Sequence, residues 1–315
     1  MVTKFLNARK TKNLLFPSFL ISCFYIYFSL NKNNRNDAEL KNINEEVVVM
    51  VLTTEKSILD RGKAVWETWG KDNTNFLFTL GCSSIKEIKA LKEKNQNIPD
   101  ALKPFKKTLN MPIHCLDIVE SYNQMGQKVF MVLQDTYDIY KNKANWYLLV
   151  DDDTFVFSEN LVLFTKSQNS SEKSIYGFKW KGMYDYIGGG AGMLFSGEAM
   201  KVLVDKIRKR ECDQYLEGYG DISIGNCAYQ LGIQPIYPLD NEGKPYFHPH
   251  TTKEHYKGPL PVPLYTSGSH NGKIGKDCCS NNSVTFHYVQ PAEMYTMYEN
   301  KNFISDLLSD KIIFT

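Results

Sequence analysis

The sequence has almost no surplus of charge of either sign: 37 Lys and Arg residues stand against 35 Asp and Glu residues in 315. Residues 1–46 hold seven of the basic and four of the acidic residues, so the remainder is close to neutral. A protein that binds nucleic acid needs a basic surplus to offset the phosphates, so we expect no nucleic-acid partner. With 43% hydrophobic residues, the chain has the composition of a folded globular protein.

Several common motifs are also missing. The chain has no CxxC, no HExxH, no GxxxxGK[ST] and no GxGxxG that links a first strand to a helix. These absences disfavour thiolate zinc sites, zincin-type proteases, P-loop enzymes and dinucleotide-binding Rossmann domains.

One long apolar run is present at 14–30, where 17 residues carry no charge. Four basic residues precede it, a pattern that predicts a signal anchor with a cytosolic N-terminus. A cleaved signal peptide and a buried helix are the alternatives, but no clear cleavage site follows, and Pro17 disfavours the helix. We therefore expect a cytosolic tail (1–13), a transmembrane anchor (14–30), a stem (31–46) and a luminal domain (47–315).

Six cysteines follow the anchor, and an oxidising lumen favours disulfides between them. Their spacing does not choose among the pairings. Cys212 and Cys227 bracket Asp221, so a disulfide between these two could clamp that segment. Asn169 and Asn281 stand in Asn-x-Ser sequons and are predicted glycosylation sites.

Apolar runs and amphipathic segments alternate along the chain. The runs predict strands at 47–53, 76–80, 146–150, 175–180 and 193–196. Helices are predicted at 57–69, 84–94, 120–140, 197–208 and 221–231, and loops at 95–104 and 238–282. This alternation indicates an α/β fold whose mostly parallel sheet is flanked by helices.

Three carboxylates, Asp151, Asp152 and Asp153, directly follow the apolar run 146–150. Adjacent carboxylates repel one another and are costly to desolvate unless a cation offsets them. In open α/β sheets, ligands bind beyond the carboxyl ends of strands. Carboxylate oxygens suit Mg²⁺ or Mn²⁺, and these ions commonly bridge phosphates. A solvated acidic loop or a helix cap is the alternative.

Two histidines are candidates to complete such a site. His287 lies in the apolar run 284–289, and His250 lies in the FHPH segment 247–250. Imidazole is a common metal ligand, but a packing role for His287 and a turn role for His250 compete.

The glycines of the run 188–192, Gly189 and Gly190 among them, let the backbone approach a ligand closely, although a tight turn is the alternative. Trp180, Tyr184 and Tyr186 precede this run. Asp221 stands at the predicted start of a helix, where it is either a cap or a general base that deprotonates a sugar hydroxyl.

Taken together, these residues resemble the core 1 β1,3-galactosyltransferases, within the fringe-like β1,3-glycosyltransferases. The resemblance covers about residues 47–300 and is tightest at 146–156, 188–194, 221–227, 247–261 and 278–294. It implies a GT-A fold and a single-pass type II protein of the Golgi membrane. It further implies a homodimer and inverting transfer of galactose from UDP-galactose, with Mn²⁺, to the 3-hydroxyl of GalNAc O-linked to Ser or Thr.

The resemblance also implies residue roles. Asp153 binds the metal, Asp151 or Asp152 contacts the nucleotide sugar, and Asp151 is a second metal candidate. His287 matches the metal histidine, with His250 as its rival, and Asp221 matches the catalytic base. Other roles it implies are uridine binding by Thr53 and Arg61, and acceptor binding by Trp180, Tyr186, Gly189 and Gly190.

The chain departs from the pattern at three places, which are Gly220, Gln127 with Lys128, and a shortened 181–186 segment. These changes leave open a fringe-like transferase with another donor or acceptor. A non-catalytic luminal chaperone or lectin-like homologue is the third hypothesis, although the complete carboxylate triplet disfavours it.

Overall fold

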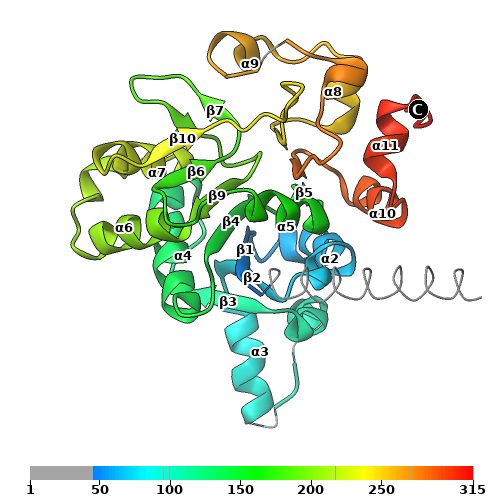
Figure 1. Cartoon of the computed structure of the whole chain (residues 1–315). Coiled ribbons are helices and arrows are strands. Elements are labelled where there is room, and N and C mark those ends of the chain that lie inside the picture. Colours follow the sequence, from blue (N-terminus) through cyan, green and yellow to red (C-terminus); the bar gives the residue numbers. More distant parts are fainter. Residues whose placement is uncertain (1–44, 95, 99, 217, 271, 315) are drawn as a thin grey trace, which may run out of the picture. The chain divides into compact units, whose positions relative to one another are not determined.

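A central twisted sheet organises the computed structural model, which describes residues 45–314 except 95, 99, 217 and 271 (Figure 1). Within these residues seven strands run in the order β10-β6-β9-β4-β1-β2-β3. They are β1 (Val47–Leu52), β2 (Asn75–Gly81), β3 (Ile113–Leu116), β4 (Trp146–Asp151), β6 (Ser174–Tyr176), β9 (Met193–Ser196) and β10 (Gln234–Ile236). Strands β4, β1, β2 and β3 are parallel, whereas β9 runs antiparallel to both β4 and β6.

Both faces of the sheet are buried, which explains the continuous apolar runs of its strands. In β1 the side chains of Val47, Val49 and Val51 enter one core, and those of Val48 and Met50 enter the other. The first core is covered by α2 (Arg61–Glu67), α5 (Ser158–Lys166), α10 (Pro291–Glu299) and α11 (Phe303–Leu308). The second is covered by α4 (Met125–Tyr140), α6 (Gly197–Arg208) and α7 (Gly220–Gln230) (Figure 1). The layers fit the expected GT-A architecture.

Two smaller sheets stand beside the central one. Strands β11 (Phe247–His248), β12 (Thr285–Phe286) and β5 (Phe155–Val156) form the first, and a hairpin of β7 (Lys179–Trp180) and β8 (Tyr186–Ile187) forms the second. Because β5 closely follows β4, the first small sheet brings the end of β12 to the carboxyl end of β4. His287 is the residue after β12.

Several predicted boundaries differ from the observed ones. The helix expected at 57–69 is split into η1 (Ser57–Leu59) and α2, because Asp60 between them has non-helical backbone angles (φ −121°, ψ −74°). The loop expected at 95–104 leads into η3 (Asp100–Asn110), and the helix expected at 120–140 begins with η4 (Tyr122–Gln124).

The expected loop region 238–282 also contains helices. They are α8 (Thr252–Lys257), α9 (Val262–Thr266) and η6 (Gly275–Asp277). Thr251 and Glu254 form a capping box at the start of α8, in which each side chain accepts a hydrogen bond from the other's backbone N–H. The spacing Thr-x-x-Glu is a sequence signal for this motif, so α8 was predictable. The remaining elements are α3 (Ser83–Glu93), η2 (Gly70–Asp72) and η5 (Asp213–Tyr215).

The prediction of a membrane span is corrected by the structure. Within its described residues, no helix is long and apolar enough to cross a membrane. The longest of them, α4, has 16 residues, against the roughly 20 apolar residues that a span needs. This finding overturns the fold with a preceding transmembrane helix and the location as a single-pass type II protein of the Golgi membrane. The run 14–30, on which both rested, lies outside the described residues.

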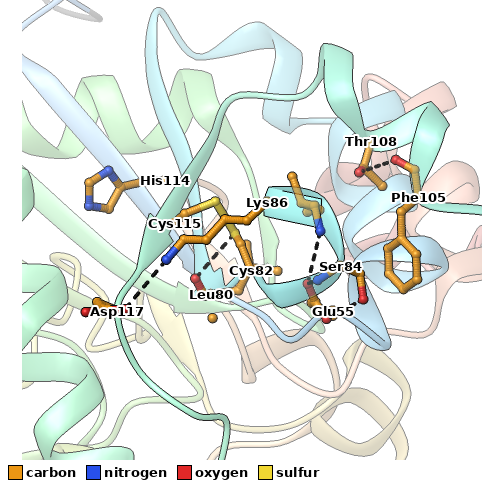
Figure 2. Close-up of a disulfide and its surroundings, with 12 residues drawn as sticks. Glu55, Leu80, Cys82, Ser84, Lys86, Phe105, Thr108, His114, Cys115 and Asp117 are labelled. Carbon is orange, nitrogen blue, oxygen red and sulfur yellow. Dashed lines mark hydrogen bonds and ion pairs between the residues drawn. A yellow bond between two sulfur atoms is a disulfide. The ribbon is translucent and has the colours of Figure 1, made fainter. Parts of the chain in front are cut away.

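Disulfides join the cysteines of the described region in three pairs: Cys82–Cys115, Cys212–Cys227 and Cys278–Cys279. The second is the pair considered from the sequence. The first ties the end of β2 to β3, as Figure 2 shows. Beside it, Glu55 accepts hydrogen bonds from the backbone N–H (2.6 Å) and the hydroxyl (2.9 Å) of Ser84 at the start of α3 (Figure 2). The loops after β1 and β2 are thereby held together.

Truncation of a core side chain in β4 should destabilise the whole domain. Leu148 is fully buried in this strand, so we expect Leu148→Ala to lower the free energy of unfolding by about 2–5 kcal/mol. Leu163→Ala is the matched control, because Leu163 on α5 is 47% exposed and should cost less than about 0.5 kcal/mol. Urea unfolding with the disulfides intact measures both, and equal losses would contradict the described core.

Candidate active site

The three carboxylates lie where β4 leaves the centre of the sheet. Asp151 is the last residue of β4, and the chain turns at Asp152 and Asp153. Because β4 is flanked by β1 and β9, its end is enclosed by neighbouring strand ends. Asp152 and Asp153 are buried, whereas the Asp151 side chain keeps 42% of its surface exposed.

Donors from the first strand and first helix meet two of these carboxylates. The Thr53 hydroxyl, just after β1, donates a 2.6 Å hydrogen bond to Oδ2 of Asp152. Arg61 Nη1, at the start of α2, lies 3.6 Å from Oδ1 of Asp152 and 3.1 Å from Oδ2 of Asp153. The two residues assigned to uridine binding by resemblance therefore contact the carboxylates themselves.

His287 lies close to Asp153 and Asp151. Its Nε2 lies 3.2 Å from Oδ1 of Asp153 and 4.0 Å from Oδ2 of Asp151. The backbone fixes this approach, because the Val289 N–H donates to the Asp153 carbonyl (2.9 Å) and the His287 N–H donates to the His248 carbonyl (3.1 Å).

Asp151, Asp153 and His287 form a group that fits a divalent cation. One ligand atom from each lies within 4.8 Å of the others. Oδ1 of Asp153 is buried and faces His287 Nε2 at 3.2 Å without a well-aligned hydrogen bond, so both atoms can serve as ligands of one cation. Two carboxylates and an imidazole are a donor set that Mn²⁺ and similar ions accept. At Gly190, a Cβ atom would collide with the His287 ring, so only glycine allows this approach.

The surroundings shift the pKa values of the three carboxylates in different directions. Burial raises the pKa of Asp152, against the opposing effect of its hydrogen bond from Thr53. Desolvation, together with the charges of Asp153 and Asp152, raises the pKa of Asp151, although its exposed surface lets solvent weaken the effect. For Asp153, burial opposes the charge, but His287 and the Arg61 guanidinium outweigh it and lower the pKa. Asp153 is thus the best stabilised anion of the three.

The two histidines of the FHPH segment lie in different surroundings. His248 is fully buried, and its Nε2 lies 2.9 Å from the Ser283 hydroxyl. Burial lowers its pKa to about 3. His250 lines the cleft, but it is not part of the group formed by Asp151, Asp153 and His287. Its Nδ1 instead lies 3.2 Å from Oε2 of Glu254. The structure thus brings His287 rather than His250 to the carboxylates.

Asp221 lies in the first turn of α7 and lines the same cleft as Asp151 and His287. Its Oδ2 accepts a 3.1 Å hydrogen bond from the backbone N–H of Gly189, and its Oδ1 accepts one from Ile222 N–H (2.9 Å). Asp221 is not the N-cap residue of α7, which is Tyr219, although its bond from Ile222 satisfies one N–H of the first turn. Each carboxylate oxygen retains a lone pair for a further hydrogen.

The cleft has a volume of about 350 Å³. Trp180, Gly189 and Gly190, three of the residues expected at the acceptor, are part of its lining. Tyr186 instead lines a smaller cavity beside Gly225 of α7. Tyr184 stacks on Tyr229 at 4.0 Å between ring centroids.

A buried ion pair behind the carboxylates was missed from the sequence. Lys128 Nζ donates to both Glu120 oxygens (2.9 Å each) and to the Thr53 carbonyl (2.7 Å). Glu120 also accepts from the Gly81 N–H (2.6 Å). The pair therefore joins the ends of β1 and β2 to α4. A signal existed, because Lys128 stands three residues after Met125 and four before Val132, within the apolar stripe of its helix.

The two sequons occupy accessible places. Asn169 and Asn281 are both exposed, and each follows or lies in a turn region. Ser283, the hydroxyl residue of the second sequon, is buried and donates a hydrogen bond to the Ser280 carbonyl. Glycosylation at either asparagine stays a prediction.

Comparison with known proteins supports the resemblance. No family model matches the chain. Over 188 residues it is 27% identical to glycoprotein-N-acetylgalactosamine 3-beta-galactosyltransferase 1 of Xenopus laevis, covering 56% of this chain and 51% of that protein. Over 264 residues it is 25% identical to chondroitin sulfate synthase 3 of Homo sapiens, covering 79% and 26% respectively. Over 145 residues it is 29% identical to beta-1,3-glucosyltransferase of Mus musculus, covering 44% and 28%.

These relatives confirm the resemblance drawn from the motifs, and two of their names specify transferases of different sugars, a galactosyltransferase and a glucosyltransferase. The chain spans about half the length of the first and about a quarter of the other two.

Removal of a ligand from the metal-type group should weaken Mn²⁺ binding. We expect Asp153→Asn and His287→Ala each to lower the affinity at least about tenfold, since even loss of a group that only supports a ligand has that effect. His250→Ala is the matched control and should change the affinity less than about threefold. Calorimetric titration of Mn²⁺ in the presence of UDP measures all three. Weaker binding in His250→Ala with unchanged binding in His287→Ala would reverse the assignment.

Breaking the Lys128–Glu120 pair should leave a carboxylate in a poorly solvated place. We expect Lys128→Met to cost about 2–4 kcal/mol of unfolding free energy, with some relief because Glu120 keeps 26% of its side chain exposed. Adding Glu120→Gln should recover at least half of the loss, since the charge is gone and the Gly81 hydrogen bond can persist. Additive losses in this double-mutant cycle would show that the two side chains are not coupled.

Proposed function

We propose that this protein is a metal-dependent inverting β1,3-glycosyltransferase. In this proposal galactose passes from UDP-galactose to the 3-hydroxyl of N-acetylgalactosamine on a glycoprotein. The observation that carries it is the meeting of two chemical groups at one cleft. Asp151, Asp153 and His287 form a group that fits a cation, and two of its members, Asp151 and His287, line the cleft together with the separate carboxylate of Asp221. The similarity to a glycoprotein-N-acetylgalactosamine galactosyltransferase supports the choice of sugars.

Asp151, Asp153 and His287 would hold Mn²⁺. When bound, the ion supplies positive charge that offsets the charge building on the diphosphate leaving group. Thr53 and Arg61 then act as positioning residues, because their contacts with Asp152 and Asp153 fix the orientation of these carboxylates. A nucleotide diphosphate is the leaving group that best suits a cation held in this way.

Asp221 would act as the general base. It removes the proton from the acceptor 3-hydroxyl as that oxygen bonds to the anomeric carbon of the donor, while the bond from that carbon to the diphosphate oxygen breaks and UDP leaves with the electron pair. A single displacement inverts the anomeric carbon and needs no covalent enzyme intermediate. The Gly189 N–H and the Ile222 N–H orient the carboxylate for this step.

The acceptor side of the cleft is assigned to Trp180, Gly189 and Gly190, which line it. The absence of a side chain at Gly189 leaves room for a sugar ring near Asp221, whereas the space beside Gly190 is taken by the His287 ring.

A second candidate is β1,3 transfer of another sugar. The similarity to a beta-1,3-glucosyltransferase and to a chondroitin sulfate synthase favours it, as does Gly220 beside the candidate base. A panel of UDP-sugars against GalNAc-, fucose- and glucuronate-terminated acceptors, with linkage analysis of any product, separates the two. Preference for UDP-galactose and a GalNAc-threonine peptide supports the first candidate, and preference for any other pair supports the second. UDP binding without any transfer contradicts both.

Replacement of the candidate base should abolish transfer while donor binding survives. We expect Asp221→Asn to lower kcat by about 10²- to 10⁴-fold, the usual contribution of a general base. UDP affinity with Mn²⁺ should stay within about threefold. Asp205→Asn is the control, because Asp205 on α6 is exposed and pairs with Lys209 outside the cleft. An Asp221→Asn protein that keeps its kcat would remove Asp221 from the reaction.

A further inference from the structure

Two tyrosines at the mouth of the cleft have no part in the site described so far. Tyr122 begins η4, and Tyr219 immediately precedes α7. Both line the cleft, and they are 64% and 55% exposed. Their rings meet edge to face, at 5.7 Å between centroids and 90° between planes. Two large aromatic side chains that remain this exposed are not filling the core, which indicates a surface that meets a ligand.

The backbone holds Tyr219 in a fixed place beside Asp221. The carbonyl of Tyr219 accepts hydrogen bonds from both the N–H (3.1 Å) and the hydroxyl (3.0 Å) of Ser223. At Gly220 a Cβ atom would approach Val129 of α4 to 2.8 Å, so the first turn of α7 sits tightly on α4. The glycine that departs from the family pattern is therefore what allows this close packing. Tyr219 and Asp221 reach the cleft from one rigid turn.

Charge decides which ligand this surface suits. The Tyr122 phenol, whose pKa is raised by partial desolvation and by the nearby Tyr219 and Asp221, can donate a hydrogen bond at neutral pH as any tyrosine can. A phosphate would be repelled by Asp221, and neither tyrosine carries a positive charge that could bind it. A neutral sugar fits both features of tyrosine, because its apolar C–H face can lie on a ring and its hydroxyls can bond to the phenol.

We propose that Tyr122 and Tyr219 form a platform that binds the acceptor sugar and turns its attacking hydroxyl towards Asp221. This inference rests on the proposed function and adds the residues that select the acceptor. The two rings hold each other edge to face, so the platform is ordered before the sugar arrives, which lowers the entropic cost of binding.

Steady-state kinetics on the whole chain test the platform. The acceptor is the methyl glycoside of the best acceptor sugar from the panel, which lacks any peptide. We expect Tyr122→Ala and Tyr219→Ala each to raise the acceptor KM about tenfold, the effect of losing roughly 1.4 kcal/mol of contact. UDP affinity with Mn²⁺ should not change. Phe at either position keeps the ring and should restore KM to within about threefold of the wild type.

Tyr229→Ala is the matched control. Tyr229 lies near the end of α7, the helix that Tyr219 precedes, and is 53% exposed, but it stacks on Tyr184 and is not among the residues that line the cleft. It should leave the acceptor KM unchanged.

Three results would overturn the platform. An unchanged acceptor KM in both alanine variants shows that the sugar lies elsewhere. An equal loss of UDP affinity assigns the tyrosines to the donor. A KM effect seen with a glycopeptide but not with the methyl glycoside assigns them to the peptide. A wild-type chain that transfers to no acceptor is a different outcome, because it removes the proposed function and the platform with it.

Discussion

Three adjacent carboxylates at the end of a buried strand set the constraint on which the rest of this site depends. Like charges so close to a dry core are unfavourable unless positive or hydrogen-bonding groups surround them. The chain supplies these groups from distant segments: Thr53 and Arg61 from the first strand and helix, and His287 from the small sheet. One carboxylate oxygen of Asp153 is buried and faces only the His287 ring nitrogen among these groups, at 3.2 Å and without a well-aligned hydrogen bond. A cation held by Asp151, Asp153 and His287 would offset the remaining negative charge, which connects the fold to the proposed chemistry.

The scaffold keeps these groups in register. The carboxyl ends of β1, β2 and β4 meet at one edge of the sheet, and the Lys128–Glu120 pair ties two of them to α4. The small sheet that pairs β5 with β12 positions His287. The first turn of α7 positions Asp221, and Tyr219 directly precedes this helix. The cation-type group and the candidate base therefore come from separate supports that share one cleft. Such a division suits a reaction in which donor and acceptor enter from different sides.

Local sequence predicted the parts that depend on local physics. The apolar runs located the strands, with β9 and α6 at their predicted bounds, and the carboxylates after β4 located the site. Parts that depend on tertiary contact were out of reach. The sequence favoured His287 over His250 only through the family resemblance, and the pairing of β12 with β5 is what brings His287 to the carboxylates. The Tyr122–Tyr219 contact joins segments almost a hundred residues apart. The membrane span, predicted from the uncharged run 14–30 and the basic residues before it, is corrected by the finding that no helix of the described residues could cross a membrane.

The most direct test of the central claim is the affinity of UDP with and without Mn²⁺, measured by calorimetry on the whole chain. If the carboxylate group exists to hold a cation that meets the diphosphate, Mn²⁺ should tighten UDP binding at least about tenfold, because without it the diphosphate faces three carboxylates. EDTA should reverse the gain. Equal UDP affinity in Mn²⁺ and in EDTA would contradict the account, since the carboxylates would then have no part in binding the donor.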